Sequence, residues 1–514
     1  MAGADERWVV KACDQRAIDE RAVASGVGLD VLMESAGTNA ADWILERLRP
    51  RRVVVLAGPG GNGGDAFVVA RCLHRAGVEV ACHALVPVSA CSPATRRMSD
   101  RLEASGAEPI RSTSDNGLKA ALHRADCAVD GLFGSGLTRP LSGEALRVVG
   151  WLNGSKTKTV SLDLPSGLAS DAGEVLGEAV HADVTLAMAF LKPAHLLYPA
   201  AGSCGNTLVV DVAYHESALR AVERWSQVCE RGAIRRRLPE RRPDGHKGTF
   251  GRILVIAGSI GMTGAAILCC RAALRAGAGL VSLAVPASLD PILETALPEV
   301  ITIPLPDEGG CLVGTADVRF DEAIERADVL AVGPGLSRAA ATLDMVRATL
   351  DRFAGPIVLD ADGLHALVGH EGLLGRLAGH TVLTPHPGEL GALTGLPPLN
   401  IDAARRDRAR AFASAHGIVL VLKGRPTAIG LPSGEVYLNP TGNDGLATGG
   451  SGDVLTGLIA GFAAGGASLA DAALVGTYVH GLAAEVYARD CAPRTLIPSD
   501  LIERIPEALR EIEG

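Results

Sequence analysis

The stretch Val53-Val-Val-Leu-Ala-Gly-Pro-Gly-Gly-Asn-Gly-Gly-Asp65 decides the fold of the first half of the chain. Its apolar, β-branched start predicts a buried strand, and its glycine-rich end predicts a tight turn that leads into a helix over 66–76. A strand, a glycine turn and a helix in this order are typical of a parallel sheet covered by helices on both faces. The backbone N–H groups of such a turn can approach a phosphate or a ring closely.

Apolar runs that alternate with helical patterns continue along the whole chain. The expected strands are 52–57, 78–86, 126–129, 158–162, 183–187 and 207–212 in the first half, and 252–257, 279–285, 327–332, 356–359, 381–384 and 418–422 in the second. These runs predict an α/β fold with two doubly wound domains. We expect the domains at 1–227 and 248–514, joined by an arginine-rich linker at 228–247.

Composition and charge exclude several classes of protein. The formal net charge of -9 argues against a nucleic-acid partner. The 11 cysteines form no C-x-x-C pair, which argues against a disulfide framework or a zinc site and favours a reducing compartment. No secretory signal is visible at the start, and the uncharged stretch 454–470 is short for a membrane span and predicts a buried helix. We therefore expect a cytoplasmic protein with no membrane partner.

Polar residues follow two further strand ends in the first half, at 130–140 and 163–167. Because the carboxyl ends of parallel strands converge on one crevice, these motifs should meet the glycine turn there. The residues expected around this pocket are Asn62, Asp65, Asp130, Asp163 and Ser166. Such oxygen ligands suit a hard cation, and carboxylates beside a substrate suit proton transfer.

The glycine turn also contains G-x-G-x-x-G, which raises the alternative of a dinucleotide-dependent dehydrogenase. The next acidic residue at a suitable distance is Glu79, but it opens the following strand, whereas a ribose-binding acid should close it. The motif is therefore weak support for that activity.

In their order, the motifs at 32–37, 58–65, 130–140 and 163–167 resemble the NAD(P)H-hydrate epimerase domain of the YjeF N-terminal type over about residues 8–215. The resemblance implies a Rossmann-like domain with Asp163 as the catalytic residue at the reacting carbon. It implies potassium near Asn62, Asp130 and Ser166. It also implies substrate contacts from Gly61, Asn62, Gly63, Gly64, Asp65, Gly134, Ser135, Gly136, Leu137, Thr138, Arg139, Pro140 and Asp163. Gly61 stands where that family usually has another Asn.

The second half carries its own set of glycine-rich motifs. They are 258–266, 333–336, 359–363, 384–389 (Thr-Pro-His-Pro-Gly-Glu), 423–427 and 443–453. No G-x-x-x-x-G-K-[ST] is present, so nucleotide chemistry of the P-loop type is excluded. A glycine run at a helix start can bind an oxyanion, and Asp453 directly after it can accept a proton from a hydroxyl. This arrangement suits phosphoryl transfer to an alcohol.

These motifs resemble the ribokinase-like superfamily and, within it, the ADP/ATP-dependent NAD(P)H-hydrate dehydratase over about residues 228–512. The resemblance implies catalysis by Asp453 and contacts of the hydrated nicotinamide with Ala265, Gly335, His386 and Asp453. It implies Mg2+ near the phosphates, organised with Glu389. It implies nucleotide binding by Lys423, Gly424, Arg425, Pro426, Thr427, Asn443, Asp444, Gly445, Leu446, Ala447, Thr448, Gly449, Gly450, Ser451 and Gly452. Asp360 and Asp362 could be turn acids or ligand contacts.

Together the two resemblances imply a bifunctional enzyme, an isomerase and a lyase, that repairs hydrated NADH and NADPH. The first domain would interconvert the R and S hydrates, and the second would dehydrate the S epimer with ADP or ATP through a phosphorylated intermediate. Two alternatives stay open: a ribokinase-like small-molecule kinase with a regulatory N-terminal domain, and a nucleotide-sensing protein without turnover. The family resemblance also implies a homo-oligomer.

Overall fold

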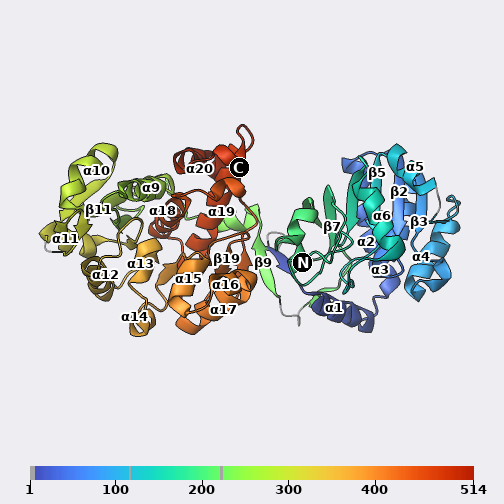
Figure 1. Ribbon diagram of the computed structural model, residues 1–514, viewed down its shortest axis with the longest axis horizontal. Coiled ribbons are helices and arrows are strands. Elements are labelled where there is room, and N and C mark those ends of the chain that lie inside the picture. Colours follow the sequence, from blue (N-terminus) through green and yellow to red (C-terminus); the bar gives the residue numbers. More distant parts are fainter. Residues whose placement is uncertain (1–5, 115–116, 220–223, 316) are drawn as a thin grey trace. The chain divides into compact units, whose positions relative to one another are not determined.

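The computed structural model describes residues 6–114, 117–219, 224–315 and 317–514 (Figure 1). The chain divides into a first unit, Arg7–Trp225, and a second unit, Ser226–Gly514. Within the described residues, no helix is long and apolar enough to cross a membrane. Each unit is built around its own sheet, and each is described separately below.

The first unit contains a fully parallel seven-stranded sheet in the order β4-β3-β2-β5-β6-β7-β8. Its strands are β2 (Arg52–Ala57), β3 (Glu79–Ala84), β4 (Arg111–Ser112), β5 (Cys127–Gly131), β6 (Lys158–Leu162), β7 (Val184–Met188) and β8 (Asn206–Val210), and β1 (Glu6–Val9) precedes them. The strand order reverses between β2 and β5. In doubly wound sheets, a ligand crevice forms at such a switch point, outside the carboxyl ends of the strands.

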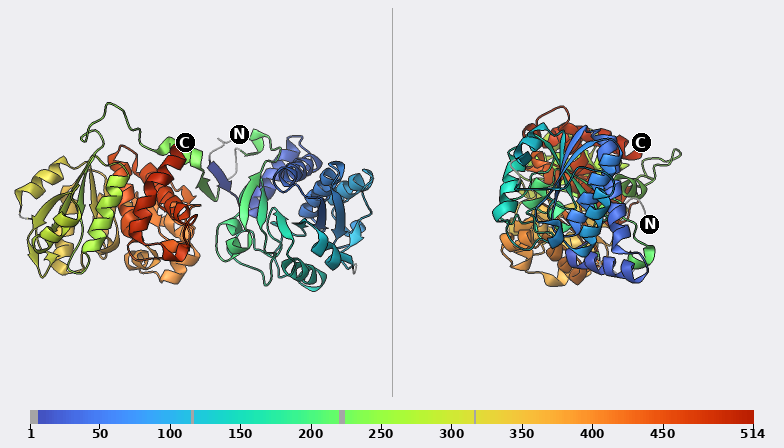
Figure 2. Two further views of the ribbon diagram at one scale, coloured as in Figure 1. Left: turned by 90° about the horizontal axis from the view of Figure 1, so that it is seen from above. Right: turned by 90° about the vertical axis from the view of Figure 1, so that its right-hand side faces the viewer.

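Helices cover both faces of this sheet. They are α1 (Ala12–Ala24), α2 (Leu29–Arg47), α3 (Gly61–Arg75), α4 (Pro93–Glu103), α5 (Gly117–Arg124), α6 (Gly143–Asn153) and α7 (Glu216–Leu219). Strand β2 shows the division: Val53 and Val55 pack with α2, α3 and α4, whereas Val54 and Leu56 pack with α5 and α6. In the left view of Figure 2, the blue and the teal helices of this unit lie on opposite sides of its strands.

Helix α3 begins five residues earlier than the sequence predicts. Residues 61–65 form its first turn, so Asn62 and Asp65 are helical rather than part of a preceding loop. Close packing explains the glycines: a Cβ on Gly63 would lie 1.9 Å from Gly58 O, and one on Gly58 would lie 1.7 Å from Leu132 O. The helix start is thereby held against the ends of β2 and β5.

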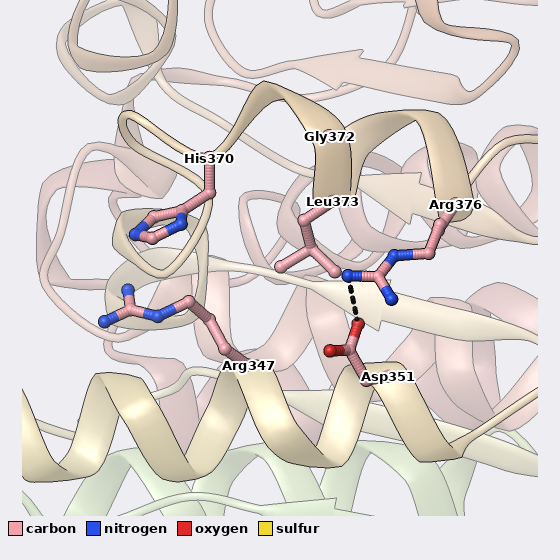
Figure 3. Close-up of a pocket in the computed structure, with 6 residues that line it drawn as sticks. All are labelled: Arg347, Asp351, His370, Gly372, Leu373 and Arg376. Atoms are coloured by element: carbon pink, nitrogen blue, oxygen red, sulfur yellow. Dashed lines mark ion pairs between the residues drawn. The ribbon is translucent and has the colours of Figure 1, made fainter.

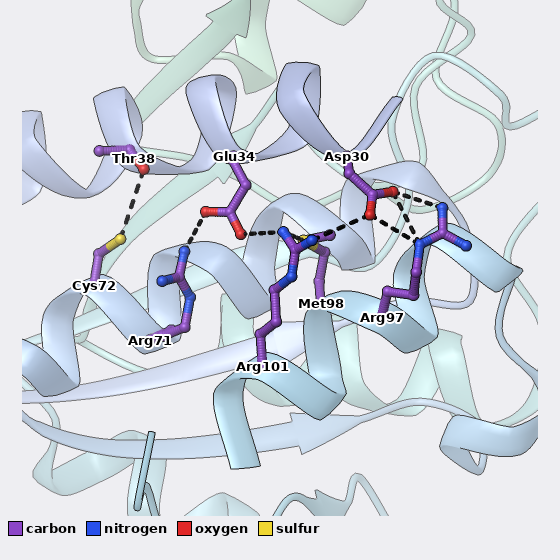
Figure 4. A network of polar contacts seen from close by, with 8 residues as sticks. All are labelled: Asp30, Glu34, Thr38, Arg71, Cys72, Arg97, Met98 and Arg101. Carbon is purple, nitrogen blue, oxygen red and sulfur yellow. Dashed lines mark hydrogen bonds and ion pairs between the residues drawn. The ribbon is translucent and has the colours of Figure 1, made fainter. Parts of the chain in front are cut away.

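A network of ion pairs ties α2 to α3 and α4 (Figure 4). Glu34 of α2 pairs with Arg71 of α3 and, at 2.7 Å, with Arg101 of α4, while Asp30 of α2 pairs with Arg97 and Arg101. These contacts hold the helix that carries Met33, whose sulfur lies 2.8 Å from the position of a Cβ on Gly64. The network therefore supports one wall of the glycine turn.

The second unit contains a mostly parallel sheet in the order β9-β20-β19-β18-β17-β16-β15-β10-β11-β12, with antiparallel pairs only at β18-β19 and β19-β20 among the described strands. The strands are β9 (Ser226–Cys229), β10 (Arg252–Ile256), β11 (Leu280–Pro286), β12 (Ile301–Leu305), β15 (Val329–Val332), β16 (Ile357–Leu359), β17 (Thr381–Leu383), β18 (Val419–Leu422), β19 (Ala428–Gly430) and β20 (Val436–Leu438), with a separate hairpin of β13 (Asp307–Glu308) and β14 (Cys311–Leu312).

One face of this sheet packs on α9, α18, α19 and α20. The helices of the second unit are α8 (Arg231–Arg237), α9 (Thr263–Arg275), α10 (Asp290–Ala296), α11 (Val318–Arg326), α12 (Ala340–Arg352), α13 (Ala361–His365), α14 (Glu371–Arg376), α15 (Pro387–Thr394), α16 (Pro398–Ala403), α17 (Arg405–His416), α18 (Ser451–Ala464), α19 (Leu469–Tyr487) and α20 (Pro498–Glu513). The predicted buried stretch 454–470 contains most of α18, whose residues 454–462 are all buried. A Cβ on Gly457 would lie 2.1 Å from Cys269 O, so glycine lets α18 approach α9 closely.

The predicted linker at 228–247 is wrong for its first half. Strand β9 and helix α8 occupy 226–237 and belong to the second unit, because Cys229 and Ile234 are buried in its core. Of the arginines that suggested a solvated linker, Arg237 is half-buried and pairs with Asp471, and the others are exposed. Arg241, for example, stacks 4.3 Å from the Phe250 ring and donates to Gly277 O at 3.1 Å.

Candidate active sites

Asp163 lies directly after β6, at the carboxyl end of the first sheet. Its backbone is left-handed, with a φ of 60°, and its N–H donates to Leu186 O at 2.8 Å. Both carboxylate oxygens have donors: Ser135 N lies 3.0 Å from Oδ2, and Lys192 Nζ lies 2.5 Å from Oδ1. Burial raises the pKa of the carboxyl, but the nearby Lys192 ammonium and these hydrogen bonds lower it more, so that the net shift is downward. The carboxyl is therefore held in its charged form.

Lys192 and His195 are two site residues that sequence reasoning missed. Lys192 is fully buried. His195 accepts a hydrogen bond from Lys192 N at Nδ1, 2.9 Å away, so its Nε2 donates to Asp163 O at 2.8 Å. Burial and the Lys192 charge lower the pKa of His195 to about 4, so its ring is neutral at neutral pH. The available signal was a single lysine after the apolar run 184–191, followed by Pro-Ala-His.

Asp130 and Ser166 form a buried polar centre beside Asp163. Ser166 Oγ lies 2.6 Å from Asp130 Oδ1, and Ser161 Oγ and Ser166 N donate to Oδ2 at 2.9 Å each. Ser166 Oγ also lies 3.1 Å from Phe133 O. Burial raises the pKa of Asp130, although these hydrogen bonds oppose the shift. The centre gathers carboxylate, hydroxyl and carbonyl oxygens.

Asn62 stands out because both polar atoms of its side chain are buried and lack a hydrogen-bond partner within the described residues. A Cβ on Gly134 would lie 3.3 Å from Asn62 Cγ and 2.9 Å from Asp163 Oδ2. The structure therefore brings the glycine turn, the loop after β5 and Asp163 together, as predicted from the strand order. An unpaired buried amide carries a free-energy cost unless a ligand or ion completes it.

Three carboxyl groups crowd this end of the first unit. Burial and the charges of Asp163 and Asp19 raise the pKa of Asp65 well above its usual value. Burial also raises the pKa of Asp19, which accepts a hydrogen bond from Tyr214. The crowding leaves Asp163, paired with Lys192, as the carboxyl that ionises most readily. The predicted substrate residues Gly136, Thr138, Arg139 and Pro140 lie exposed on the loop before α6, where their contacts stay predictions.

In the second unit, the predicted substrate residues come from four segments: the first turn of α9, the loop after β15, the N-cap of α15 and the first turn of α18. Gly335 has a left-handed backbone, and a Cβ on it would lie 2.9 Å from Ala265 Cβ, so these two residues are adjacent. His386 caps α15: its Nδ1 accepts from Gly388 N at 2.9 Å, and its own N–H donates to Glu389 Oε2 at 2.8 Å. The His386 side chain is 56% exposed and free to meet a ligand at Nε2, apart from a 3.5 Å contact with Glu389.

Asp453 lies in the first turn of α18 and is surrounded by carboxylates. Burial, followed by the negative charge of Asp360, raises the pKa of Asp453 to about 7, and Lys423 only partly offsets this. Asp360 is buried and accepts from Lys423 Nζ at 2.7 Å and from Thr456 Oγ1 at 2.8 Å. A carboxyl with a pKa near the working pH is suited to accept a proton.

The predicted nucleotide residues lie on two loops. The first loop, Gly424 to Pro426, is stabilised by Arg405, which donates a hydrogen bond to Pro426 O at 3.0 Å. The guanidinium of Arg405 also fills the space beside Gly424. The second loop leads into α18: Gly450 is left-handed, and Asn443 is fixed by a hydrogen bond to Ala484 O at 2.8 Å. The remaining predicted members, 444–449, 451 and 452, continue this loop into the first turn of α18.

Lys423 differs from the other predicted nucleotide residues because it already forms ion pairs with carboxylates of this unit. Besides Asp360, it lies 3.6 Å from Glu389 Oε2. A Cβ on Gly452 would lie 3.3 Å from Lys423 Nζ, which puts the ammonium beside the start of α18. Opposite charges on both sides raise the pKa of Lys423 even though burial lowers it. The start of α18 therefore has a fixed positive charge next to it.

A surface cavity of about 310 Å3 lies elsewhere in the second unit (Figure 3). It lies between α12 and α14, and the ion pair Arg376–Asp351, at 2.9 Å, crosses one end of it. It is lined by Arg347, Asp351, His370, Gly372, Leu373 and Arg376. None of these residues is a predicted site residue, so this cavity is separate from the candidate site.

Comparison with known proteins shows the family. Residues 29–194 match the family described as YjeF-related protein N-terminus, and residues 253–507 match the family described as NAD(P)H-hydrate dehydratase. A relative from Moorella thermoacetica, named bifunctional NAD(P)H-hydrate repair enzyme Nnr, is 38% identical over 94% of this chain and 93% of its own length. The chain belongs to the bifunctional NAD(P)H-hydrate repair enzyme family.

Other members of the repair enzyme family match over similar lengths. The Nnr protein of Thermofilum pendens is 36% identical over 98% of this chain and 96% of its own. A solved ADP/ATP-dependent NAD(P)H-hydrate dehydratase from Bacillus subtilis, co-crystallised with ATP/Mg2+, covers 55% of this chain and 97% of its own at 31% identity, with a TM-score of 0.46. The predicted family and the predicted α/β fold are confirmed.

Proposed function

We propose that the first unit interconverts the R and S hydrates of NADH and NADPH, and that the second unit dehydrates the S hydrate with ADP or ATP. The proposal rests mainly on Asp453, a carboxyl with a pKa of about 7. It lies in the first turn of a helix that follows a glycine-rich loop, beside the Lys423 ammonium. Proton acceptor, anion-binding helix start and fixed cation are the three parts that phosphoryl transfer to an alcohol needs.

In the second unit, the hydroxyl of the hydrate donates its proton to Asp453 while its oxygen attacks the terminal phosphorus of the nucleotide. The P–O bond to that phosphorus breaks, and AMP leaves from ADP or ADP leaves from ATP. Hydroxide is a poor leaving group, but the phosphate of the ester formed in this step leaves readily as inorganic phosphate. The C–O bond then breaks with help from the lone pair of the ring nitrogen, and loss of a proton from the neighbouring carbon restores the dihydronicotinamide. Amides at the start of α18 stabilise the phosphate charge.

Mg2+ would neutralise phosphate oxygens when bound with the nucleotide. Within the described residues, no cluster of three His, Cys, Asp or Glu side chains could hold a metal alone. This fits Mg2+, which usually binds through phosphates, water and one or two carboxylates. Glu389 is the residue we propose for this role, because it is buried beside Lys423 and caps α15 with only one oxygen.

In the first unit, Asp163 would accept the proton of the hydroxyl at the reacting carbon. Potassium would supply a fixed positive charge near the substrate, and the residues proposed to hold it are Asn62, Asp130 and Ser166. The residues fit such an ion, because the side-chain oxygen of Asn62 is buried without a partner and the Asp130–Ser166 centre offers further oxygens. Asp65, whose pKa is raised well above its usual value by burial, would contact the substrate from α3.

The test uses each purified hydrate epimer with the full-length protein. Without nucleotide, the R hydrate should approach the R/S equilibrium at an enzyme-dependent rate. With ADP or ATP, the S hydrate should return to the reduced dinucleotide, and comparison of the two nucleotides identifies the donor. No turnover of either epimer would overturn the proposal.

A small-molecule kinase with a regulatory first unit is the weaker candidate, because full-length relatives named as repair enzymes match both halves. That alternative predicts a stable phosphorylated product from a simple alcohol and no repair of hydrated dinucleotide. A homo-oligomer remains a prediction, which sedimentation velocity on the full-length protein tests.

A further inference from the structure

Lys192 is a buried positive charge with a single carboxylate partner. None of its side chain is exposed, and all three ammonium protons have acceptors: Asp163 Oδ1 at 2.5 Å, Phe190 O at 3.1 Å and Met188 O at 3.3 Å. Burying an ammonium costs free energy unless an opposite charge lies beside it. The pair is therefore stable only while Asp163 is ionised.

The geometry also fixes where the Asp163 carboxylate points. One oxygen is held by Lys192, the other by Ser135 N at 3.0 Å, and His195 Nε2 donates to the backbone oxygen at 2.8 Å. Because His195 Nδ1 accepts from Lys192 N, one compact unit links the loop after β6 to the segment 188–195. Asp163 thus cannot turn away from the Asn62–Gly134 wall without breaking these contacts.

We propose that Lys192 is a positioning residue for epimerisation, which keeps Asp163 a carboxylate and aims it at the hydroxyl-bearing carbon. The inference rests on the proposed epimerase function of the first unit. A carboxylate can accept the proton of the substrate hydroxyl, whereas a protonated carboxyl cannot. Without Lys192, burial would favour the protonated form of Asp163, and the base would be lost at neutral pH.

The other groups near Asp163 strengthen this dependence. Asp65 from α3, and Asp19 from α1 with its partner Tyr214, all lie within electrostatic range, and each carboxylate charge opposes ionisation of Asp163. His195 is neutral at neutral pH. Lys192 is thus the cation that offsets both the burial and the neighbouring acids.

The test measures conversion of pure R hydrate to S hydrate without nucleotide, by chiral chromatography, across a pH series. In K192M, the acid limb of kcat should move up past neutral pH, so that kcat at pH 7 falls by about tenfold or more, while KM changes by less than about threefold. K192R should keep the wild-type acid limb. K156M, which removes an exposed lysine of the same unit, should match the wild type.

A wild-type acid limb in K192M, or an upward shift in K192R equal to that of K192M, would overturn the inference. Because a variant of a buried charge can unfold, a second measurement uses the wild-type protein alone. Carbon-13 NMR of labelled aspartate, assigned with D163N, should show Asp163 ionised at pH 6; a protonated Asp163 at that pH would overturn the inference. If the wild type fails to convert R hydrate, the proposed function fails, and the NMR titration still decides the state of Asp163.

Discussion

Lys423 Nζ lies 2.7 Å from Asp360 Oδ1, and this ion pair lies beside the start of α18, whose first turn contains Asp453. The pair couples the loop after β18 to the loop after β16. Burial and the negative charge of Asp360 raise the pKa of Asp453 to about 7, and the Lys423 ammonium only partly offsets this rise. The charges around the start of α18 therefore set the pKa of the residue that we propose as the proton acceptor.

The first prediction concerns the pH dependence of dehydration. Asp453 must be deprotonated to accept the hydroxyl proton, so the rate should rise through about pH 7 and level off above it. At pH 6, the rate should be about tenfold below its plateau. D453N should remove the activity at every pH, whereas D344N, at an exposed carboxylate, should keep it. A flat profile between pH 6 and 8 would contradict this assignment.

The raised pKa of Asp453 also predicts how folding stability depends on pH: stability should fall as the pH rises, whereas the dehydration rate should increase. The folded state holds the Asp453 proton more tightly than the unfolded chain, so folding stability falls as the pH rises from about 4 to about 7. D453N should therefore unfold at a higher temperature than the wild type at pH 8. The difference should shrink at pH 5, and an equal Tm difference at both values would contradict the raised pKa.

Thr456 supports Asp360 through a buried hydrogen bond of 2.8 Å. T456V should lower the free energy of unfolding by about 1–3 kcal/mol, because a buried carboxylate loses a donor. T477V is the matched control: Thr477 is equally buried but donates to Ala473 O within its own helix. If denaturant unfolding gives the same loss of unfolding free energy for both variants, the hydrogen bond to Asp360 contributes no more to stability than the hydrogen bond within the helix.

Gly457 lets α18 pack on α9. G457A should destabilise the second unit by about 1–3 kcal/mol, because the added Cβ would meet Cys269 O. G375A, where a Cβ meets nothing within 4 Å, should be neutral or stabilise by up to about 1 kcal/mol. Denaturant unfolding followed at several probes separates the two cases; a neutral G457A would show that the helices can move apart without cost.

A variant of Asn62 tests the proposal that this side chain helps to hold potassium in the first unit. N62A removes a buried oxygen that lacks a partner, and should raise the potassium concentration for half-maximal epimerase rate by about tenfold, equivalent to about 1.4 kcal/mol. N206A, at an exposed strand end, should leave the potassium response unchanged. An unaltered response in N62A would show that this side chain does not hold the ion.

The elements of the fold were largely predictable, because buried parallel strands have a strong apolar signal. Each of the expected strands is present, with ends that differ by at most two residues. The strands that were not predicted are short, with two to five residues each, and they pair only through the tertiary fold: β1, β4, β9, β12, β13, β14, β19 and β20. The linker prediction was wrong for its first half because the high arginine content of this segment indicated a solvated chain. Cys229 and Ile234, which lie among these arginines, are buried.

For the sites, motif residues at strand ends could be predicted, and their supports could not. Asp163 and Asp453 stand in local patterns, whereas Lys192 and Arg405 act across 29 and 21 residues through contacts that only the folded chain creates. The pairing of Lys423 with Asp360, 63 residues apart, is of the same kind. Sequence patterns identify the residues that we propose as reacting groups, and tertiary packing sets their charge states.

The most direct test of the central claim is one assay of the full-length wild-type protein with a mixture of R and S hydrate and ADP. Absorbance of the reduced dihydronicotinamide ring follows the repair. The account predicts that both epimers are consumed completely, and that D163N stops after the S fraction apart from slow spontaneous exchange. Wild-type repair that ends with the R hydrate untouched would contradict the account.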